Sequence, residues 1–393
     1  MSGSVSVRAG FIPLLDAALL IAAAEKGFAA GEGLELALQR ETSWANIRDR
    51  IAIGHFDVAH MLAPLPIAAS LGLVPLAVPM VAPFALGRGG NAVTVSTALW
   101  ALLEAAGAPS DGDPVATGRA LKAVIAARAV AGEAPLTFAV VNSFSGHNYE
   151  LRYWLAAAGI DPWRDVQFAV VPPPFMADAL SAGRIDAYCV GEPWNTAAVM
   201  ADVGRIVTTK AAIWPDSIDK VLGMRADWAD AHADVVRRLI VALQAAAEWC
   251  GAPANHEELA AILAAPEFLG VGADRILAGL SGRISLGSGA PARVPDFLSL
   301  AGAATEPQVE HGLWLYSQMV RWGQAELGAE AIEAVRRTMR ADVRRAALGP
   351  GVDQSTGAVQ LFDGVAFDGA AIGDYLAVLP FGGIVPASKL RSE

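Results

Sequence analysis

The sequence is poor in cysteine and in charge, and each shortage excludes a class of protein. Its 393 residues contain two cysteines, Cys189 and Cys250, too few for a disulfide framework or a zinc-ligand pattern. Charged residues make up 18% of the chain, and the formal net charge is -11. Because binding to a nucleic-acid backbone requires a basic face, the acidity argues against a direct nucleic-acid partner. It does not exclude a small anion, since a pocket can be locally positive inside an acidic protein.

Common catalytic motifs are also missing. No Gly-Lys pair occurs, so there is no Walker phosphate loop, and no Gly-x-Gly-x-x-Gly follows the first expected strand. His-Glu-x-x-His and the Gly-x-Ser-x-Gly elbow are absent as well. His55 and His60 are five residues apart, the wrong spacing for two metal ligands on one helix face. The sequence therefore favours a binding protein over an enzyme and predicts no metal and no cofactor.

Apolar residues are abundant, at 54% of the chain, which is enough to bury a large core. Residues 58–87 contain no Asp, Glu, Lys or Arg, and a stretch of that length could cross a bilayer. Five prolines interrupt it, however, and proline removes a helical hydrogen bond and clashes with the preceding turn. We therefore expect short buried elements separated by turns, and no membrane insertion.

Strand-like and helix-like segments alternate along the first half of the chain. Residues 5–11 form a strand pattern that leads into a helix, and residues 34–39 form another, followed by a helix that Ser43 caps. The same order restarts at residues 137–142, and beyond Asp227 the pattern is mainly helical. This alternation predicts an α/β protein with parallel strands and covering helices.

The restart of the pattern divides the chain into two lobes. We predict that residues 1–98 and 212–393 form lobe I, with a helical C-terminal extension, and that residues 99–211 form lobe II. In open α/β sheets, ligands bind beyond the carboxyl ends of the strands, and helix N-termini attract anions. A cleft between the lobes is therefore the expected ligand site.

Several residues near expected helix starts or loops could bind an anion. Each also has a structural interpretation: a core tryptophan, a turn asparagine, a capping histidine, a solvated lysine or a hinge glutamate. These candidates are Trp44, Asn91, His147, Lys220 and Glu192. The spacing alone does not decide between anion binding and the structural role of each residue.

Eight segments of the chain resemble, in order, the nitrate/bicarbonate/sulfonate substrate-binding family. The resemblance is strongest to NrtA-type nitrate-binding proteins and to the cytoplasmic nitrate sensors of the NasS type. The segments are 10–13 (GFIP), 42–49 (TSWANIRD), 62–66 (LAPLP), 151–155 (LRYWL), 171–174 (VPPP), 190–195 (VGEPWN), 223–228 (GMRADW) and 321–323 (RWG). The resemblance implies a periplasmic-binding-protein-like fold of type II, with two α/β lobes around a ligand.

The resemblance also implies roles for individual residues. Trp44 and the backbone near Ala45 would contact the anion, although relatives carry Gly at the latter position. His147 would donate a hydrogen bond and Lys220 would supply the charge. Asn91 matches a Gln of the relatives. Relatives that bind bicarbonate with calcium carry a carboxylate near the position of Lys220, so a lysine favours nitrate or nitrite.

The chemistry of nitrate fits such a site. Nitrate is a planar monoanion that accepts hydrogen bonds and has none to donate, so a cleft made only of donors suits it. Hydrogen bonds to a charged group contribute about 1.5–3 kcal/mol each. We therefore expect a positively charged cleft without carboxylates.

Three functions remain open. The chain begins with no basic region followed by an apolar run, which is the pattern of a secretory signal, so a cytoplasmic location is expected. A cytoplasmic member of this family would be a nitrate or nitrite sensor that releases a NasT-like antiterminator with an ANTAR domain. The alternatives are the substrate-binding protein of an ABC-type nitrate transporter and an enzyme such as a thiamine-precursor synthase, for which Cys189 is a thin candidate nucleophile.

Replacing the candidate charge partner tests the expected site. Lys220→Ala is expected to weaken nitrate binding strongly while the fold stays intact, because the ammonium would be the main charge facing the anion. Calorimetry on the purified variant measures the affinity. An unchanged affinity would remove Lys220 from the site.

Overall fold

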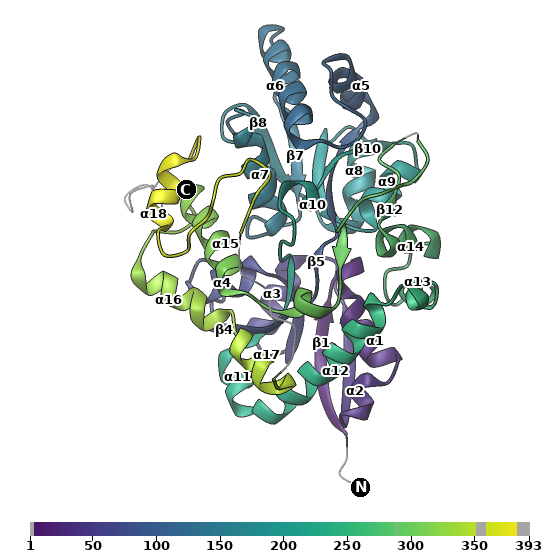
Figure 1. The fold of residues 1–393 in the computed structure, drawn as a ribbon, viewed down its shortest axis with the longest axis vertical. Coiled ribbons are helices and arrows are strands. Elements are labelled where there is room, and N and C mark those ends of the chain that lie inside the picture. The colour runs from purple at the N-terminus through teal and green to yellow at the C-terminus, as the bar shows by residue number, and fades with distance from the viewer. Residues whose placement is uncertain (1–3, 288, 351–358, 383–393) are drawn as a thin grey trace.

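The computed structural model describes residues 4–287, 289–350 and 359–382. Figure 1 shows two α/β lobes stacked along the long axis of the molecule, with the C-terminal helices packed along one side of both. Each lobe is built around one five-stranded sheet. The predicted periplasmic-binding-protein-like architecture, with two α/β lobes and a helical C-terminal region, is confirmed.

The sheet of lobe I has the strand order β2-β1-β3-β11-β4. Strand β1 (Val5–Phe11) pairs in parallel with β2 (Leu34–Arg40) and β3 (Val58–Leu62). Strand β11 (Lys220–Arg225) is antiparallel to both β3 and β4 (Met80–Ala85). The strand that starts with Lys220 therefore lies inside the sheet, with a partner on each side.

The sheet of lobe II has the order β10-β6-β9-β7-β8. Strand β7 (Leu136–Val140) pairs in parallel with β8 (Val166–Val170) and β9 (Ala187–Gly191). Strand β6 (Asn91–Ser96) is antiparallel to β9 and to β10 (Gly204–Thr209). Asn91 thus begins a strand, which agrees with neither the turn interpretation nor a loop position for this residue.

The chain crosses between the lobes at two places that lie side by side. The first crossing lies between β4 and β6, one strand earlier than the predicted boundary at residue 98, because β6 already belongs to the second sheet. The return crossing lies between β10 and β11, close to the predicted boundary at residues 211–212. The amide of Gly89 donates to the carbonyl of Ser217 at 3.1 Å, so the two crossings are bonded to each other.

A third segment joins the crossings. The short strand β5 (Arg88–Gly89) of the first crossing pairs with β14 (Leu298–Ser299), and β12 (Arg283–Ile284) pairs with β13 (Ala292–Arg293) nearby. Gly89 has a φ of 76°, and a Cβ there would overlap the carbonyl of Phe297. Only glycine fits this position, because both the left-handed backbone and the close approach exclude a side chain.

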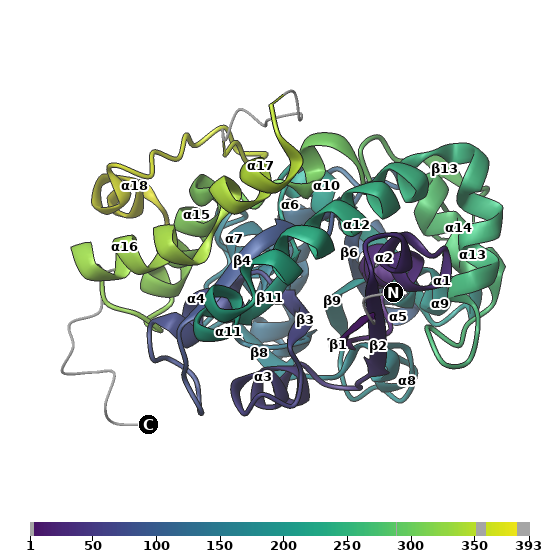
Figure 2. The ribbon, with the colours of Figure 1, turned by 90° about the horizontal axis from the view of Figure 1, so that it is seen from below.

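Helices flank both sheets, and the inner strands β3 and β9 are buried along their whole length. Figure 2 shows the long helix α12 crossing lobe I beside α1. The helices are α1 (Ala18–Glu25), α2 (Phe28–Gly31), α3 (Trp44–Ala52), α4 (Pro64–Ser70), α5 (Thr97–Ala105), α6 (Pro114–Val130), α7 (Gly146–Ala157), α8 (Met176–Ser181), α9 (Trp194–Met200), α10 (Lys210–Ile213), α11 (Ala226–Ala231), α12 (Ala233–Gly251), α13 (His256–Leu263), α14 (Ala273–Ser281), α15 (Val309–Arg321), α16 (Ala329–Thr338), α17 (Ala341–Leu348) and α18 (Ile372–Val378).

Residues 58–87, the proline-rich apolar segment, form the short buried elements that their prolines predicted. These elements are two short strands and the short helix α4, which begins at Pro64 and is buried. Among the described residues, no helix has the length and apolarity that a membrane crossing requires. The mainly helical pattern predicted beyond Asp227 includes α16 and α17, and Met339 and Arg340 leave helical geometry between these two helices.

Close packing between β1 and the residues before β3 can be tested with one glycine. A Cβ at Gly10 would overlap the ring of Phe56, whereas a Cβ at Gly31 would meet no atom within 4 Å. We expect Gly10→Ala to lower the free energy of unfolding by about 1–3 kcal/mol through overpacking. Gly31→Ala, a helical control, should be neutral or slightly stabilising in the same urea titration. Equal effects would show that the Phe56 ring yields to the extra methyl group.

Candidate functional site

Two helices start opposite each other in the space between the lobes, and they start in the same way. Ser43 caps α3 in lobe I by accepting a hydrogen bond from the amide of Asn46 at 3.2 Å. Ser145 caps α7 in lobe II through the amide of Asn148 at 3.0 Å. Serine with an extended backbone is a favoured helix cap, and the sequence Ser-x-x-Asn predicts both starts. Each lobe thus presents the positive end of a helix dipole to the region between them.

Trp44 and His147 are held at these two helix starts. Trp44 is the first residue of α3 and is buried, and Ala45 beside it is half-buried. His147 is the second residue of α7 and has no exposed surface. The Nε1 of Trp44 and both ring nitrogens of His147 are buried without a hydrogen-bond partner among the described residues.

Lys220 lies between the two helix starts at the first position of β11. Its Nζ is 2.9 Å from Oδ2 of Asp16 and also contacts the carboxylate of Asp219. The ammonium lies over the ring of Trp44, 5.4 Å from the ring centre. Only 1% of Lys220 is exposed, so its charge is neutralised by buried carboxylates and not by water.

Asp16 joins Lys220 to His60. The Nε2 of His60 lies 2.9 Å from Oδ1 of Asp16, and its Nδ1 accepts a hydrogen bond from the amide of Ile12 at 3.4 Å. The accepting Nδ1 places the ring proton on Nε2, towards the carboxylate. Burial works against ionisation of Asp16, but Lys220 and His60 outweigh it and hold its pKa below the usual value. Burial lowers the pKa of His60 despite the neighbouring Asp16, so the ring is neutral.

Asp219 joins Lys220 to lobe II. Its Oδ2 lies 3.7 Å from Nε2 of His147, and its Oδ1 lies 3.5 Å from Nζ of Lys210. Burial opposes the charge of Asp219, but His147, Lys210 and Lys220 hold its pKa well below the usual value. Burial also lowers the pKa of His147 to about 3, so this imidazole is neutral at physiological pH and can donate from one ring nitrogen.

Lys210 and Glu150 complete the polar core. The Nζ of Lys210 is 2.8 Å from Oε1 of Glu150, and it also donates to the carbonyl of Ile218 at 3.2 Å. Burial raises the pKa of Glu150 to about 7, although Lys210 favours its charged form. The charged groups from Asp16 to Glu150 thus form a row of alternating sign that runs from lobe I into lobe II, which we call the ion-pair row: Asp16, Lys220, Asp219, Lys210 and Glu150.

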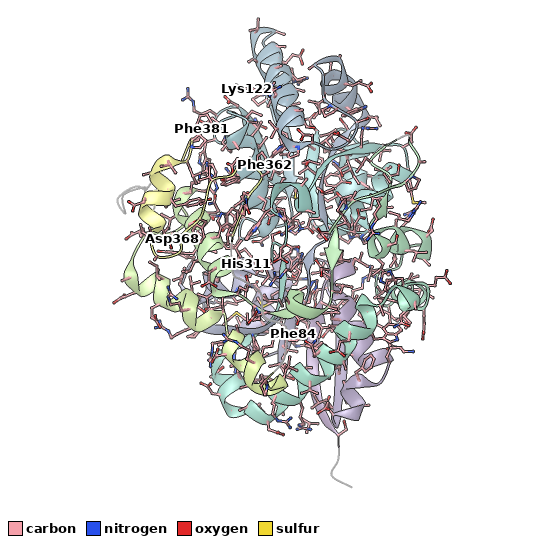
Figure 3. All side chains as sticks on the ribbon, in the orientation of Figure 1. Phe84, Lys122, His311, Phe362, Asp368 and Phe381 are labelled. Carbon is pink, nitrogen blue, oxygen red and sulfur yellow. The ribbon has the colours of Figure 1, made fainter. Side chains whose placement is uncertain are left out.

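Two further polar residues lie near the row. Asn91 is fully buried, and neither its amide nitrogen nor its amide oxygen has a hydrogen-bond partner within the described ranges. Figure 3 places His311, on α15, near the middle of the molecule. Its ring meets that of Trp214 edge-on at 5.1 Å, and burial, with Arg88 and Lys210, holds its pKa well below the usual value.

Glu192 lies apart from these groups and braces the lobes. Its Oε2 accepts a hydrogen bond from the amide of Thr196 at 3.1 Å, and its backbone carbonyl accepts one from the amide of Leu15 at 2.8 Å. Next to it, Nε1 of Trp194 donates to the carbonyl of Pro13 at 3.0 Å. These contacts are those expected of a hinge residue, while Oε1 of Glu192 is buried without a hydrogen-bond partner among the described residues.

The structure corrects one expectation and supplies residues that sequence reasoning missed. A cleft made only of donors was expected, but Asp16 and Asp219 lie on Lys220, so the site contains acceptors as well. Asp16 interrupts an apolar stretch, and Asp219 precedes Lys220 directly; both signals were visible but unused. His60 was considered only as a metal partner of His55, which instead contacts Gln39 at the surface.

The site offers little for catalysis. Burial raises the pKa of the Cys189 thiol well above its usual value, so this cysteine does not supply a thiolate nucleophile. In the part of the chain that the structure describes, no three His, Cys, Asp or Glu side chains are grouped as metal ligands. The arrangement is suited to holding a small polar ligand with donors from both lobes.

The burial of Lys220 changes what its removal should do. Lys220→Ala leaves two buried carboxylates without their cation, so the free energy of unfolding should fall by about 3–5 kcal/mol, contrary to the expectation of an intact fold. Without the cation the folded state raises the pKa of these carboxylates above the unfolded values. The deficit should therefore shrink as pH falls from 8 to 5.

Urea unfolding at both pH values measures this deficit. The exposed Lys122 provides the control, because Lys122→Ala should change stability by less than about 0.5 kcal/mol. A small and pH-independent loss for Lys220→Ala would show that the carboxylates reach water without the lysine.

Comparison with known proteins agrees with the fold. The NrtA nitrate/nitrite binding protein of Synechococcus elongatus is 33% identical over 392 residues, covering 95% of this chain and 86% of that protein. The crystal structure of the periplasmic nitrate-binding protein NrtA from Synechocystis PCC 6803 superposes with a TM-score of 0.86 at 28% identity, over 96% of this chain and 99% of that one.

A longer relative and a family model complete the comparison. The bicarbonate transport ATP-binding protein CmpC of Synechocystis is 35% identical over 369 residues, which is 93% of this chain and 53% of CmpC. This chain thus spans about half the length of that relative. The model of the NMT1-like family matches residues 2–264. With two thirds of its length matched and the lobed architecture shared, the chain belongs to the NMT1-like family.

Proposed function

We propose that this protein binds a small oxyanion, nitrate or nitrite, between its two lobes and does not catalyse a reaction. The observation that carries the proposal concerns three of the buried polar groups that lack a hydrogen-bond partner among the described residues: Nε1 of Trp44, the side-chain amide of Asn91 and the imidazole of His147. Nearly all buried polar groups in folded proteins are hydrogen-bonded. Buried polar groups without a hydrogen-bond partner on both lobes therefore indicate a ligand. The nitrate-binding relatives support the same anion.

The geometry fits a planar anion held at two helix starts. Trp44 begins α3 and offers a flat aromatic wall with an N–H donor, and His147 begins α7 and donates as a neutral imidazole. Lys220 lies over the Trp44 ring, and its ammonium is a further N–H donor there, although Asp16 and Asp219 already neutralise its charge. Donors fixed in a buried site need no rearrangement when the anion arrives, and this preorganisation favours binding.

Bicarbonate is a second candidate because of one observation. Asp16 and Asp219 are hydrogen-bond acceptors on either side of Lys220, and bicarbonate carries a proton that it can donate to such an acceptor. The relative CmpC is named for bicarbonate transport. Against this candidate stands the lysine itself, because the family resemblance associates bicarbonate binding with a carboxylate at that position.

We further propose that the protein is a cytoplasmic sensor. The anion would prefer the closed arrangement of the lobes, and a NasT-like regulator with an ANTAR domain would prefer the open one, so that anion binding releases the regulator. The alternative is the substrate-binding protein of an ABC-type nitrate transporter, which the NrtA relatives favour. In both cases the chain acts by binding and closure.

The anion itself can be tested with one histidine variant. His147→Ala should weaken nitrate binding by roughly tenfold to a hundredfold, since one hydrogen bond to a charged ligand contributes about 1.5–3 kcal/mol. The exposed His232 gives the control variant His232→Ala, which should bind as the wild type does. Calorimetry with nitrate, nitrite and bicarbonate would also rank the three anions. Failure of all three to bind the wild type would overturn the proposal.

The sensor role requires a protein partner that responds to the anion. A tagged protein purified from its native cells should bring down an ANTAR-domain regulator, and nitrate in the wash should release it. If the partner is absent, and fractionation finds the protein outside the cytoplasm, the transporter role is correct.

A further inference from the structure

The positive and negative charges of the ion-pair row do not cancel. The ion-pair row contains the two lysines Lys210 and Lys220 and three carboxylates, and the imidazoles beside it are neutral. With every carboxylate ionised, these groups carry a net charge of minus one before any ligand enters. All five side chains of the row are buried, so water contributes little to screening.

An incoming monoanion makes this imbalance larger. A second uncompensated negative charge in a region of low dielectric costs several kcal/mol, and buried groups avoid such a cost by changing their protonation. Nitrate is the anion of a strong acid and does not take up the proton itself. The compensating proton must therefore go to a protein side chain.

Glu150 is placed to accept it. It lies on α7, three residues after His147, and its Oε2 is buried with no hydrogen-bond partner among the residues described. A Cβ on Gly146 would lie 3.0 Å from Asp219 Oδ1, 3.3 Å from Lys210 Nζ and 3.5 Å from Glu150 Oε1. These three groups thus meet around Gly146, where a side chain would be in tight contact with them.

Charged and titratable groups from three elements surround Glu150. Lys210 from α10 faces its Oε1, and Asp219 and Lys220 act on it from the start of β11. The neutral thiol of Cys189 on β9 lies close enough to be influenced by the same charges. Burial raises the pKa of Glu150 to about 7, whereas the pKa values of Asp16 and Asp219 are lowered. Of the three carboxylates, Glu150 is the one that is protonated most readily.

We propose that the site takes up its oxyanion together with a proton, and that Glu150 is the residue that accepts this proton. The balance is simple: one anion and one proton enter, Glu150 changes from carboxylate to carboxylic acid, and no bond of the anion is broken. The row then carries no net charge of its own, and the complex carries that of the anion. This inference rests on the proposed function, because it concerns the same site.

The coupling has a definite sign. Above pH 7 free Glu150 is ionised, so binding must draw a proton from solution, and the affinity should fall by up to about tenfold for each pH unit. Below pH 6 Glu150 is already protonated, so the affinity should level off. The pH dependence comes from the protein, since nitrate does not titrate in this range.

Calorimetry measures the coupling directly. Nitrate is titrated into the full-length protein from pH 6 to 8.5, in pairs of buffers with different ionisation enthalpies, which gives both the affinity and the number of protons taken up. Wild type is expected to take up close to one proton per nitrate at pH 8. Glu150→Gln removes the titrating group in a neutral form, so it should bind nitrate more tightly than wild type at pH 8, with little pH dependence.

A second glutamate gives the matched control. Glu306 is buried and its Oε1 lies 3.6 Å from Arg345 Nε, outside the ion-pair row, so Glu306→Gln should keep the wild-type pH profile. Nitrate binding without proton uptake in the wild type would overturn this inference and leave the proposed function standing. Proton uptake that persists in Glu150→Gln would overturn the assignment to Glu150. No nitrate binding at any pH would instead overturn the proposed function.

Discussion

The rest of the region between the lobes depends on the ammonium of Lys220 and the two carboxylates that hold it. A buried charge is tolerated only when it is paired, so Lys220 fixes the positions of Asp16 in lobe I and of Asp219 at the return crossing. Through Asp219 the same constraint reaches Lys210 and Glu150 in lobe II. The two lobes are thus joined by electrostatic pairs in addition to apolar packing.

This constraint explains why the polar side chains around the row remain available to a ligand. Lys220 and Asp219 pair with each other, while Trp44, Asn91 and His147 keep buried polar atoms without partners in the described chain. Firm pairing of the charges keeps the neutral donors in place. A site of this kind separates the groups that hold the framework from the groups that select the ligand.

Much of the fold and part of the site could be predicted from local sequence. The alternation of strands and helices predicted two lobes, and Ser43 marked one helix start because capping is decided within four residues; Ser145 caps α7 by the same local rule but was not named as a cap. The first crossing was placed too late because no strand was predicted over residues 91–96, where β6 begins at the polar Asn91 directly after two glycines. Which sheet a strand joins depends on partners distant in the chain.

The ion-pair row could not be predicted in the same way. Asp16 and Lys220 are separated by 204 positions, and Glu150 and Lys210 belong to different elements of lobe II, so no spacing rule connects them. Family resemblance singled out Lys220 and His147, but not the carboxylates that contact them. A buried acidic residue inside an apolar run, as at Asp16, is the local signal that such a partner exists.

The hydrogen-bonded contact between the two crossings and β14 has a consequence for the motion of the lobes. The two crossings are bonded to each other, and β14 is bonded to the first of them, so the lobes are tied by a small antiparallel ribbon and not by loose single chains. The hydrogen bonds hold these segments side by side, so the segments must move together when the lobes move. Any opening of the two lobes should therefore be a bending of this ribbon. On closing, the ribbon should bring the starts of α3 and α7 back to the same alignment each time.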